Sequence, residues 1–96
     1  MNRGRPRKPV RVAWNYVPRE FYTADATEFV FLDFRELEAM RLVDLLGLDL
    51  DGAAQRLGVS KTTVWRLVRS ARAKLCDAVV NGKRIVVKAG EATPRK

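Results

Sequence analysis

The chain has 96 residues, a formal net charge of +8 and a normal share of hydrophobic residues, 47%. These values fit one domain with a modest core and favour a polyanionic partner. One cysteine and no histidine exclude an intramolecular disulfide, a Cys/His zinc site within one chain, and Ser–His or Cys–His catalysis.

Charge is sorted along the sequence. Residues 1–24 carry a net charge of +5, residues 25–58 carry −5 and residues 59–96 carry +8. The longest uninterrupted apolar run has four residues, Phe29–Leu32, so we expect no membrane span and no signal peptide. We therefore expect a cytoplasmic protein, nucleoid-associated if it binds DNA, that is not an enzyme and uses no metal or cofactor.

Residues 1–9, MNRGRPRKP, form a basic arm in which prolines and a glycine argue against a helix or strand. Its sequence resembles an AT-hook, an extended Gly-Arg-Pro segment that lies in the minor groove of A·T-rich DNA. The candidate minor-groove residues are Arg3, Arg5, Arg7 and Lys8. A flexible tail with only non-specific phosphate attraction explains the same composition equally well.

Two β-prone segments follow the arm. Val10–Tyr16 partly alternates and ends before Pro18, and Glu28–Leu32 is aromatic and β-branched. Residues 19–28 show no period and are expected to be loop. The aromatic side chains of residues 14–22 are expected to pack in the core or in an interface rather than to stack on bases.

The segment from Asp33 to Gly47 predicts a helix with an inward stripe. Asp33 and Glu36 have the spacing of a capping box. The expected stripe consists of Leu37, Met40, Val43 and Leu46. The acids of this region, which include Glu36, Glu38, Asp44, Asp49 and Asp51, are interpreted as caps and solvated faces.

Residues 50–70 predict a helix-turn-helix. Ala54, Gly58 and Val64 stand where such a motif needs a small contact, a turn and a buried anchor. Ser60 can cap a second helix, expected from Lys61 to about Val80. Apolar residues then recur at helical spacing from Val64 to Leu75.

The face opposite Val64 is cationic, and no acid occurs between Gly58 and Cys76. Such a helix suits the DNA major groove, where Arg, Lys and Thr contact base edges and phosphates. The candidates for base readout are Thr62, Trp65, Arg66 and Arg69, and those for phosphate contact are Lys61, Thr63, Arg72 and Lys74. A solvated basic face on an ordinary helical hairpin is the alternative explanation.

Lys83–Lys88 predicts a last strand, and residues 89–96 a disordered tail. One strand needs a partner. The sequence offers Val10–Tyr16, Glu28–Leu32 or the same strand of a second copy. Because many helix-turn-helix proteins pair two half-sites, we expect a homodimer that uses these edges, with Ile85 and Val87 on one face and Val86 on the other.

Two resemblances arise from these motifs. Residues 33–75, with ELEAMRLVDLL, GVS at the turn and ARAKL at the end, resemble region 4 of sigma-70-type transcription factors. Nearly the whole chain, including RPRKPVRV, GVSKTTVWRLVRSARAKL and DAVVNGKRIVV, resembles a small uncharacterised prokaryotic family of predicted DNA-binding proteins. The resemblance implies a DNA-binding regulator and supplies no ligand.

The sequence thus predicts a mainly α fold. A three-helix core with a sigma region-4-like helix-turn-helix spans residues 10–88, with short strands near both termini and a basic arm before it. The expected function is sequence-specific double-stranded DNA binding in transcription. The alternative is an interaction adapter that docks on RNA polymerase or another transcription factor, with DNA secondary.

The arm generates the first prediction. Deleting residues 1–8 should weaken DNA binding and reduce the salt slope by about 0.9 for each phosphate that the arm neutralises, because fewer counterions are released. Titrations of A·T-rich and G·C-rich duplexes over a salt series measure both effects. An equal loss on the two duplexes would show that the arm is a plain cationic tail.

Overall fold

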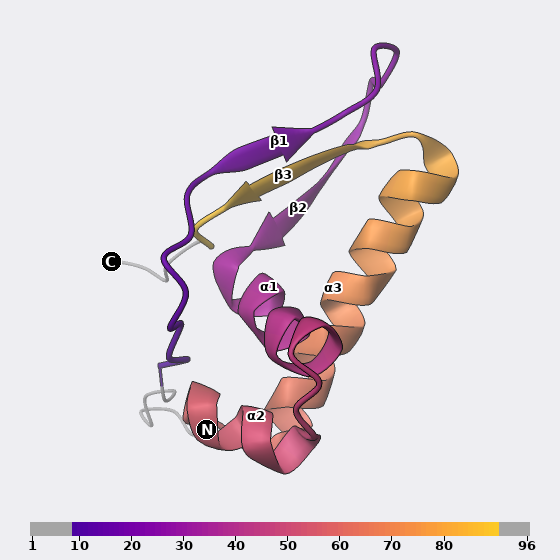
Figure 1. The fold of residues 1–96 in the computed structure, drawn as a ribbon. Coiled ribbons are helices and arrows are strands. Elements are labelled where there is room, and N and C mark those ends of the chain that lie inside the picture. The colour runs from indigo at the N-terminus through magenta and orange to yellow at the C-terminus, as the bar shows by residue number, and fades with distance from the viewer. Residues whose placement is uncertain (1–8, 91–96) are drawn as a thin grey trace, which may run out of the picture.

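The computed structural model describes residues 9–90, in which a small sheet lies against three α-helices (Figure 1). The elements are β1 (Arg19–Phe21), β2 (Phe29–Asp33), α1 (Phe34–Met40), a π-helical turn η1 (Arg41–Leu45), α2 (Leu50–Leu57), α3 (Lys61–Asn81) and β3 (Arg84–Lys88). Helices make up about half of the described chain, and three short strands form one sheet.

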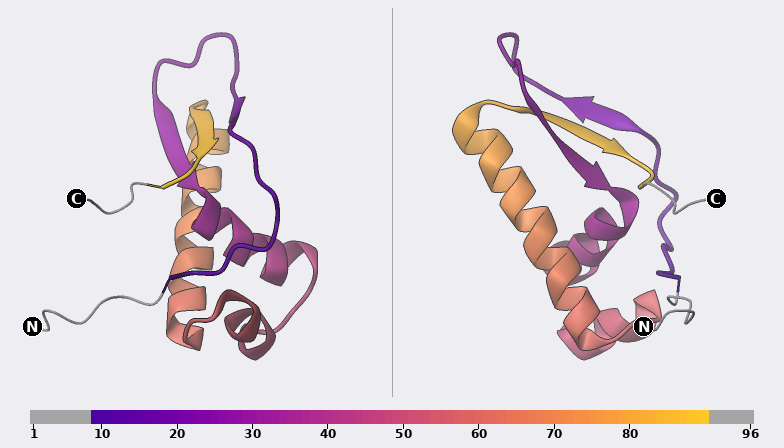
Figure 2. Two further views of the ribbon diagram at one scale, coloured as in Figure 1. Left: turned by 90° about the vertical axis from the view of Figure 1, so that its left-hand side faces the viewer. Right: turned by 180° about the vertical axis from the view of Figure 1, so that it is seen from behind.

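β3 lies in the middle of the sheet, antiparallel to β1 and parallel to β2 (Figure 2). Ile85 and Val87 face the helices and Val86 faces away, as the alternation predicts, and Val87 is almost fully buried. Both edges of this strand are occupied within the chain. The expectation that its edge pairs with a second copy is therefore wrong.

The segment Val10–Tyr16 is not a strand. Its polar groups have other partners: the Arg11 N–H donates to the Leu57 carbonyl (2.8 Å) and the Ala13 N–H to the Glu38 carboxylate (3.2 Å). The strand lies instead at Arg19–Phe21, in the stretch expected to be loop. We call residues 10–18 the N-terminal strap; it runs from the sheet to the end of α2 (Figure 2).

The start of α1 agrees with the prediction. The Asp33 carboxylate accepts hydrogen bonds from the N–H groups of Arg35 and Glu36, and the Glu36 carboxylate accepts one from the Asp33 N–H. This reciprocal arrangement is a capping box. At the other end, the Leu46 N–H donates to the Arg41 carbonyl (2.9 Å), which widens the helix into η1.

The expected inward stripe is confirmed in part, because Leu37, Met40 and Val43 are partly buried against apolar clusters. Ala39 and Leu42 are the fully buried apolar residues of this helical stretch, whereas Leu46 is 49% exposed. After Met40 the wider turn of η1 departs from a spacing of 3.6 residues per turn, and Leu46 at its end lies outward. The two most buried apolar positions of this stretch, Ala39 and Leu42, are thus ones that the periodicity did not identify.

Two acids of α1 are also not solvated as expected. Glu36 and Glu38 are buried, and several hydrogen-bond donors to each carboxylate offset the cost of burying its charge. Glu38 accepts hydrogen bonds from the Tyr16 hydroxyl (2.9 Å) and the Arg41 guanidinium (2.7 and 2.9 Å). Tyr16 also stacks on Phe34. The strap is therefore fixed to α1 through a buried carboxylate.

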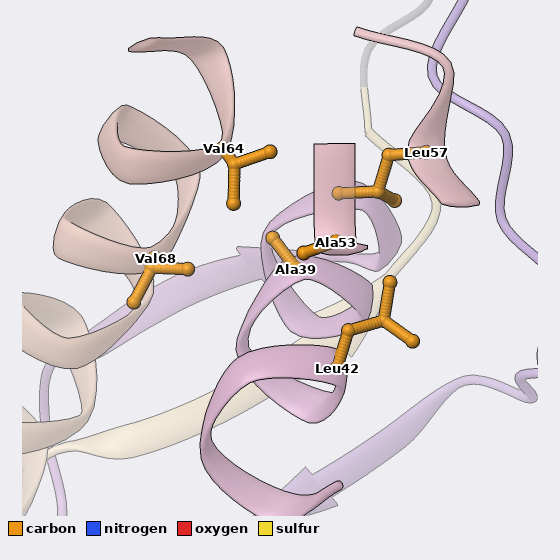
Figure 3. Close-up of a cluster of buried hydrophobic side chains, with 6 residues drawn as sticks. All are labelled: Ala39, Leu42, Ala53, Leu57, Val64 and Val68. Atoms are coloured by element: carbon orange, nitrogen blue, oxygen red, sulfur yellow. The ribbon is translucent and has the colours of Figure 1, made fainter. Parts of the chain in front are cut away.

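Two apolar clusters support these elements. Where α1, η1, α2 and α3 meet, six buried residues pack together, and Figure 3 shows them facing one another. They are Ala39, Leu42, Ala53, Leu57, Val64 and Val68. The second cluster joins Leu32 and Val87 of the sheet to Ala71 of α3. The first cluster fixes the angle at which α2 meets α3, and the second holds the sheet on the other half of α3.

Glu38 generates a prediction about pH. Burial works to raise the pKa of its carboxyl, but hydrogen bonds from Arg41, Tyr16 and Ala13 outweigh burial and lower that pKa. A folded-state pKa below the unfolded value adds stability above the unfolded value of about 4.3, and this stability is lost as pH falls through the folded-state pKa. Glu38→Gln should remove that part of the acid dependence and lower the free energy of unfolding at pH 7 by about 3 kcal/mol.

Urea unfolding between pH 2 and 7 measures both effects. Glu28→Gln is the matched control, because the Glu28 side chain is 73% exposed. A Glu38→Gln protein that keeps the wild-type acid dependence would contradict the role of this carboxylate.

Candidate nucleic-acid interface

A three-residue turn, Gly58 to Ser60, joins α2 to α3. Gly58 has φ of +72°, and its N–H donates to the Ala54 carbonyl (2.8 Å). The Ser60 side chain accepts a hydrogen bond from the Thr63 N–H (3.1 Å) and so caps α3. Val64 is fully buried one turn later. The turn, cap and anchor thus lie at the residues that the sequence indicated.

α3 has one buried face and one exposed face. Val64, Val68, Ala71 and Ala78 are buried, while Thr62, Arg66 and Arg69 are exposed on the opposite side. Neither arginine forms an ion pair with any residue from 9 to 90. Two free guanidinium groups therefore stand one turn apart on the outer face of α3.

The four expected phosphate residues have different surroundings. Lys61 is exposed, and its ammonium lies 3.6 Å from the Asp51 carboxylate, which is also exposed. Such a pair is weak and easily replaced. The Thr63 hydroxyl accepts a hydrogen bond from Ser60 (3.1 Å). These two residues lie at the first turn of α3.

Arg72 is held by two groups. Its guanidinium donates two hydrogen bonds to Asp44 of η1, at 3.0 and 2.6 Å, and lies 5.8 Å from the centre of the Trp65 ring. The hydrogen bonds from Arg72 lower the pKa of the Asp44 carboxyl. The pair therefore stays charged in mildly acidic solution, and Trp65, 44% exposed, lies against the paired arginine.

Lys74 points away from the outer face of α3. Its ammonium donates to both oxygens of the buried Glu36 carboxylate, at 2.9 and 2.8 Å, and the Ser70 hydroxyl donates to the same carboxylate. This contact compensates a buried charge. The structure thus gives Lys74 a role in joining α1 to α3.

Arg11 is a cation that the sequence did not place in the interface. The backbone bond from its N–H to Leu57 brings it to the end of α2, and its guanidinium donates to the Gln55 carbonyl (3.5 Å) and lies against Gly58. Together with Ser60 and Lys61 it lines an open hollow beside the start of α3. No local signal could have shown this, because a segment expected to be a strand supplies the residue.

The remaining expected residues cannot be placed. Arg3, Arg5, Arg7 and Lys8 lie outside the described residues, as does most of the expected tail, from residue 91. Within residues 9–90, no three Cys, Asp or Glu side chains gather as a metal site. No helix in this part of the chain is long and apolar enough to cross a membrane.

The sequence matches a family described as "Protein of unknown function DUF134" over residues 1–95. The chain belongs to the DUF134 family. The resemblance to a small prokaryotic family is thereby confirmed. This match does not bear on the similarity to sigma region 4.

Curated relatives of this DUF134 chain are named UPF0251 protein. The one from Methanocella arvoryzae is 45% identical over 76 residues, which cover 79% of this chain and 45% of the relative. The one from Thermococcus kodakarensis is 41% identical over 83 residues, 80% of this chain and 74% of the relative. One from Methanosarcina acetivorans is 42% identical over 93 residues, 92% and 82%. The chain thus spans less than half of the Methanocella protein. No solved structure matches this chain.

The turn generates a prediction with a matched pair of glycines. Gly58→Ala and Gly82→Ala each place a Cβ at positive φ, so each should lower the free energy of unfolding by about 1–2 kcal/mol. Only at Gly58 does the Cβ meet the Arg11 guanidinium, while nothing lies within 4 Å at Gly82. Urea unfolding measures the stability of each variant, and the NMR signal of the Arg11 Nε–H reports whether the Arg11 guanidinium is displaced from the turn.

Only Gly58→Ala should move that signal. An Arg11 signal that is equally unaffected in both variants would place the guanidinium away from the turn.

Proposed function

We propose that this protein binds double-stranded DNA in a sequence-specific manner and regulates transcription. The observation that carries the proposal is the pair of exposed guanidinium groups, Arg66 and Arg69, which no described acid neutralises. Guanidinium groups on the outer face of a helix can donate two hydrogen bonds to the major-groove edge of guanine.

The element that presents them supports this proposal. α2, the turn at Gly58 and α3 have the order, turn length and buried anchor of a helix-turn-helix, in which the second helix enters the major groove. The similarity of residues 33–75 to sigma region 4 points the same way. In this arrangement Thr62 and Trp65 join the two arginines as base contacts.

Phosphate contacts are assigned to the start of α3. Lys61, Thr63 and Arg11 lie beside the N-terminus of a 21-residue helix, where unpaired N–H groups and the helix dipole attract anions. Arg72 can reach a phosphate only by exchanging Asp44 for it. Lys74 is left out, because its ammonium compensates Glu36. The N-terminal arm is proposed to lie in the minor groove or on phosphates.

An adapter that docks on RNA polymerase or another factor is the second candidate. It is favoured by exposed apolar side chains that belong to elements other than α3: Leu45 is 76% exposed, Leu46 49% and Trp14 57%. The homodimer also stays a prediction. Because β3 is central, the free sheet edges among the described strands are the outer sides of β1 and β2.

Arg66 provides the test of DNA binding. We expect Arg66→Ala to weaken binding to a site selected from a random duplex pool by about 1–3 kcal/mol, with a smaller loss on random duplex, because a bidentate base contact is removed. Arg35→Ala is the matched control: Arg35 is exposed, lies on α1 and pairs with Asp33. Fluorescence anisotropy at fixed salt measures the affinities.

Equal losses on selected and random duplexes would make Arg66 a phosphate contact only. If the wild type selects no sequence and binds duplex weakly across the salt series, the adapter replaces the DNA-binding proposal.

A further inference from the structure

An apolar hollow of about 350 Å³ lies between the strap, the sheet and the helices. Leu37 of α1, Leu75 of α3 and Val87 of β3 form its inner walls, and Trp14, Val17 and Phe21 form its rim. The three rim residues are between 47% and 57% exposed. Ligand pockets of small molecules have volumes from about 300 Å³ and are lined mainly by such side chains.

One charged residue, Arg19, lines the open edge of this hollow. Arg19 is opposite Val87 in the antiparallel pair of β1 and β3, so the two side chains share the inner face of the sheet. Val87 is buried on that face, whereas Arg19 is exposed; Arg19 lines this hollow and also a second hollow beside Val86 and Lys88. Among residues 9–90 no carboxylate forms an ion pair with Arg19. The hollow therefore combines apolar walls with one cation that no described acid neutralises.

We infer that this hollow binds a small amphipathic anion, with the apolar body between Trp14, Leu75 and Val87 and its carboxylate on the Arg19 guanidinium. The charge of Arg19 selects an anion over a neutral or cationic ligand, and the apolar walls select an alkyl or aromatic body over a sugar or a nucleotide. The Tyr16 hydroxyl is not available to the ligand, because it is bound to Glu38.

Arg19 can also have a role that involves no ligand. β1 is an edge strand, and an inward-pointing charge on such a strand discourages pairing with another chain. In that case Arg19 keeps the protein from self-association and has no ligand. Removal of the Arg19 charge should weaken anion binding if Arg19 holds a ligand, and should promote self-association if Arg19 protects the edge strand.

The experiment uses the full chain and octanoate as the probe, with 1-octanol as the neutral ligand of equal length. The two indole N–H signals in ¹⁵N NMR spectra report on separate regions, because Trp14 lines the hollow and Trp65 lies on α3. We expect octanoate to move the Trp14 signal in a saturable way, to leave Trp65 unchanged and to bind more tightly than 1-octanol.

Arg19→Gln should weaken octanoate binding about tenfold, as expected for loss of a charged hydrogen bond, and leave 1-octanol binding unchanged. Arg56→Gln is the matched control, since Arg56 is exposed on α2 and also has no ion pair among residues 9–90. Val17→Phe, a change at the exposed rim that leaves the core intact, should weaken both ligands by narrowing the hollow.

Three results would overturn the inference: no saturable shift at Trp14, equal affinity of the wild type for octanoate and 1-octanol, or equal effects of Arg19→Gln and Arg56→Gln. Self-association of Arg19→Gln in sedimentation, with octanoate binding unchanged, would assign Arg19 to protection of the edge strand. These outcomes do not involve DNA, so they are independent of the proposed function.

Discussion

The buried carboxylate of Glu38 holds the N-terminal strap, which runs from the sheet to the end of α2. A charge at 1% exposure is costly unless it is well paired, and here a hydroxyl, a backbone N–H and a guanidinium all donate to it. Two of these donors, Tyr16 and Ala13, belong to the strap. The strap is not part of the sheet. The bonds from Tyr16 and Ala13 to Glu38, with the bond from the Arg11 N–H to the Leu57 carbonyl, hold it on α1 and α2 instead.

The strap gives the two proposed sites a shared backbone segment. Arg11, near its start, lies at the α2–α3 turn, and Trp14 and Val17 lie at the apolar hollow. A ligand that orders one end of such a segment changes the entropy of ordering the other end, and this coupling is reciprocal. The proposed anion site and the proposed DNA surface therefore meet in one element, although they lie on different parts of the fold.

Local signals in the sequence predicted the helix ends well, and they failed where distant residues decide. Asp33, Gly58 and Ser60 act through neighbours within four residues, so their roles could be predicted from spacing. Glu36 and Glu38 are buried by partners from the strap and from α3, which no spacing reveals. For the same reason Lys74 and Arg72, both expected to be outward cations, are bound to carboxylates of α1 and η1, while Arg11 arrives at the turn from a segment expected to be a strand.

The central position of β3 has a consequence for the order in which the protein can form. The helical unit from Phe34 to Asn81 contains its own apolar cluster, so its helices can pack on one another before the sheet is complete. β1 and β2 do not pair with each other, and their only described strand partner is β3. Neither strand has a strand partner until residues 84–88 lie between them, so the sheet can form only around its last strand.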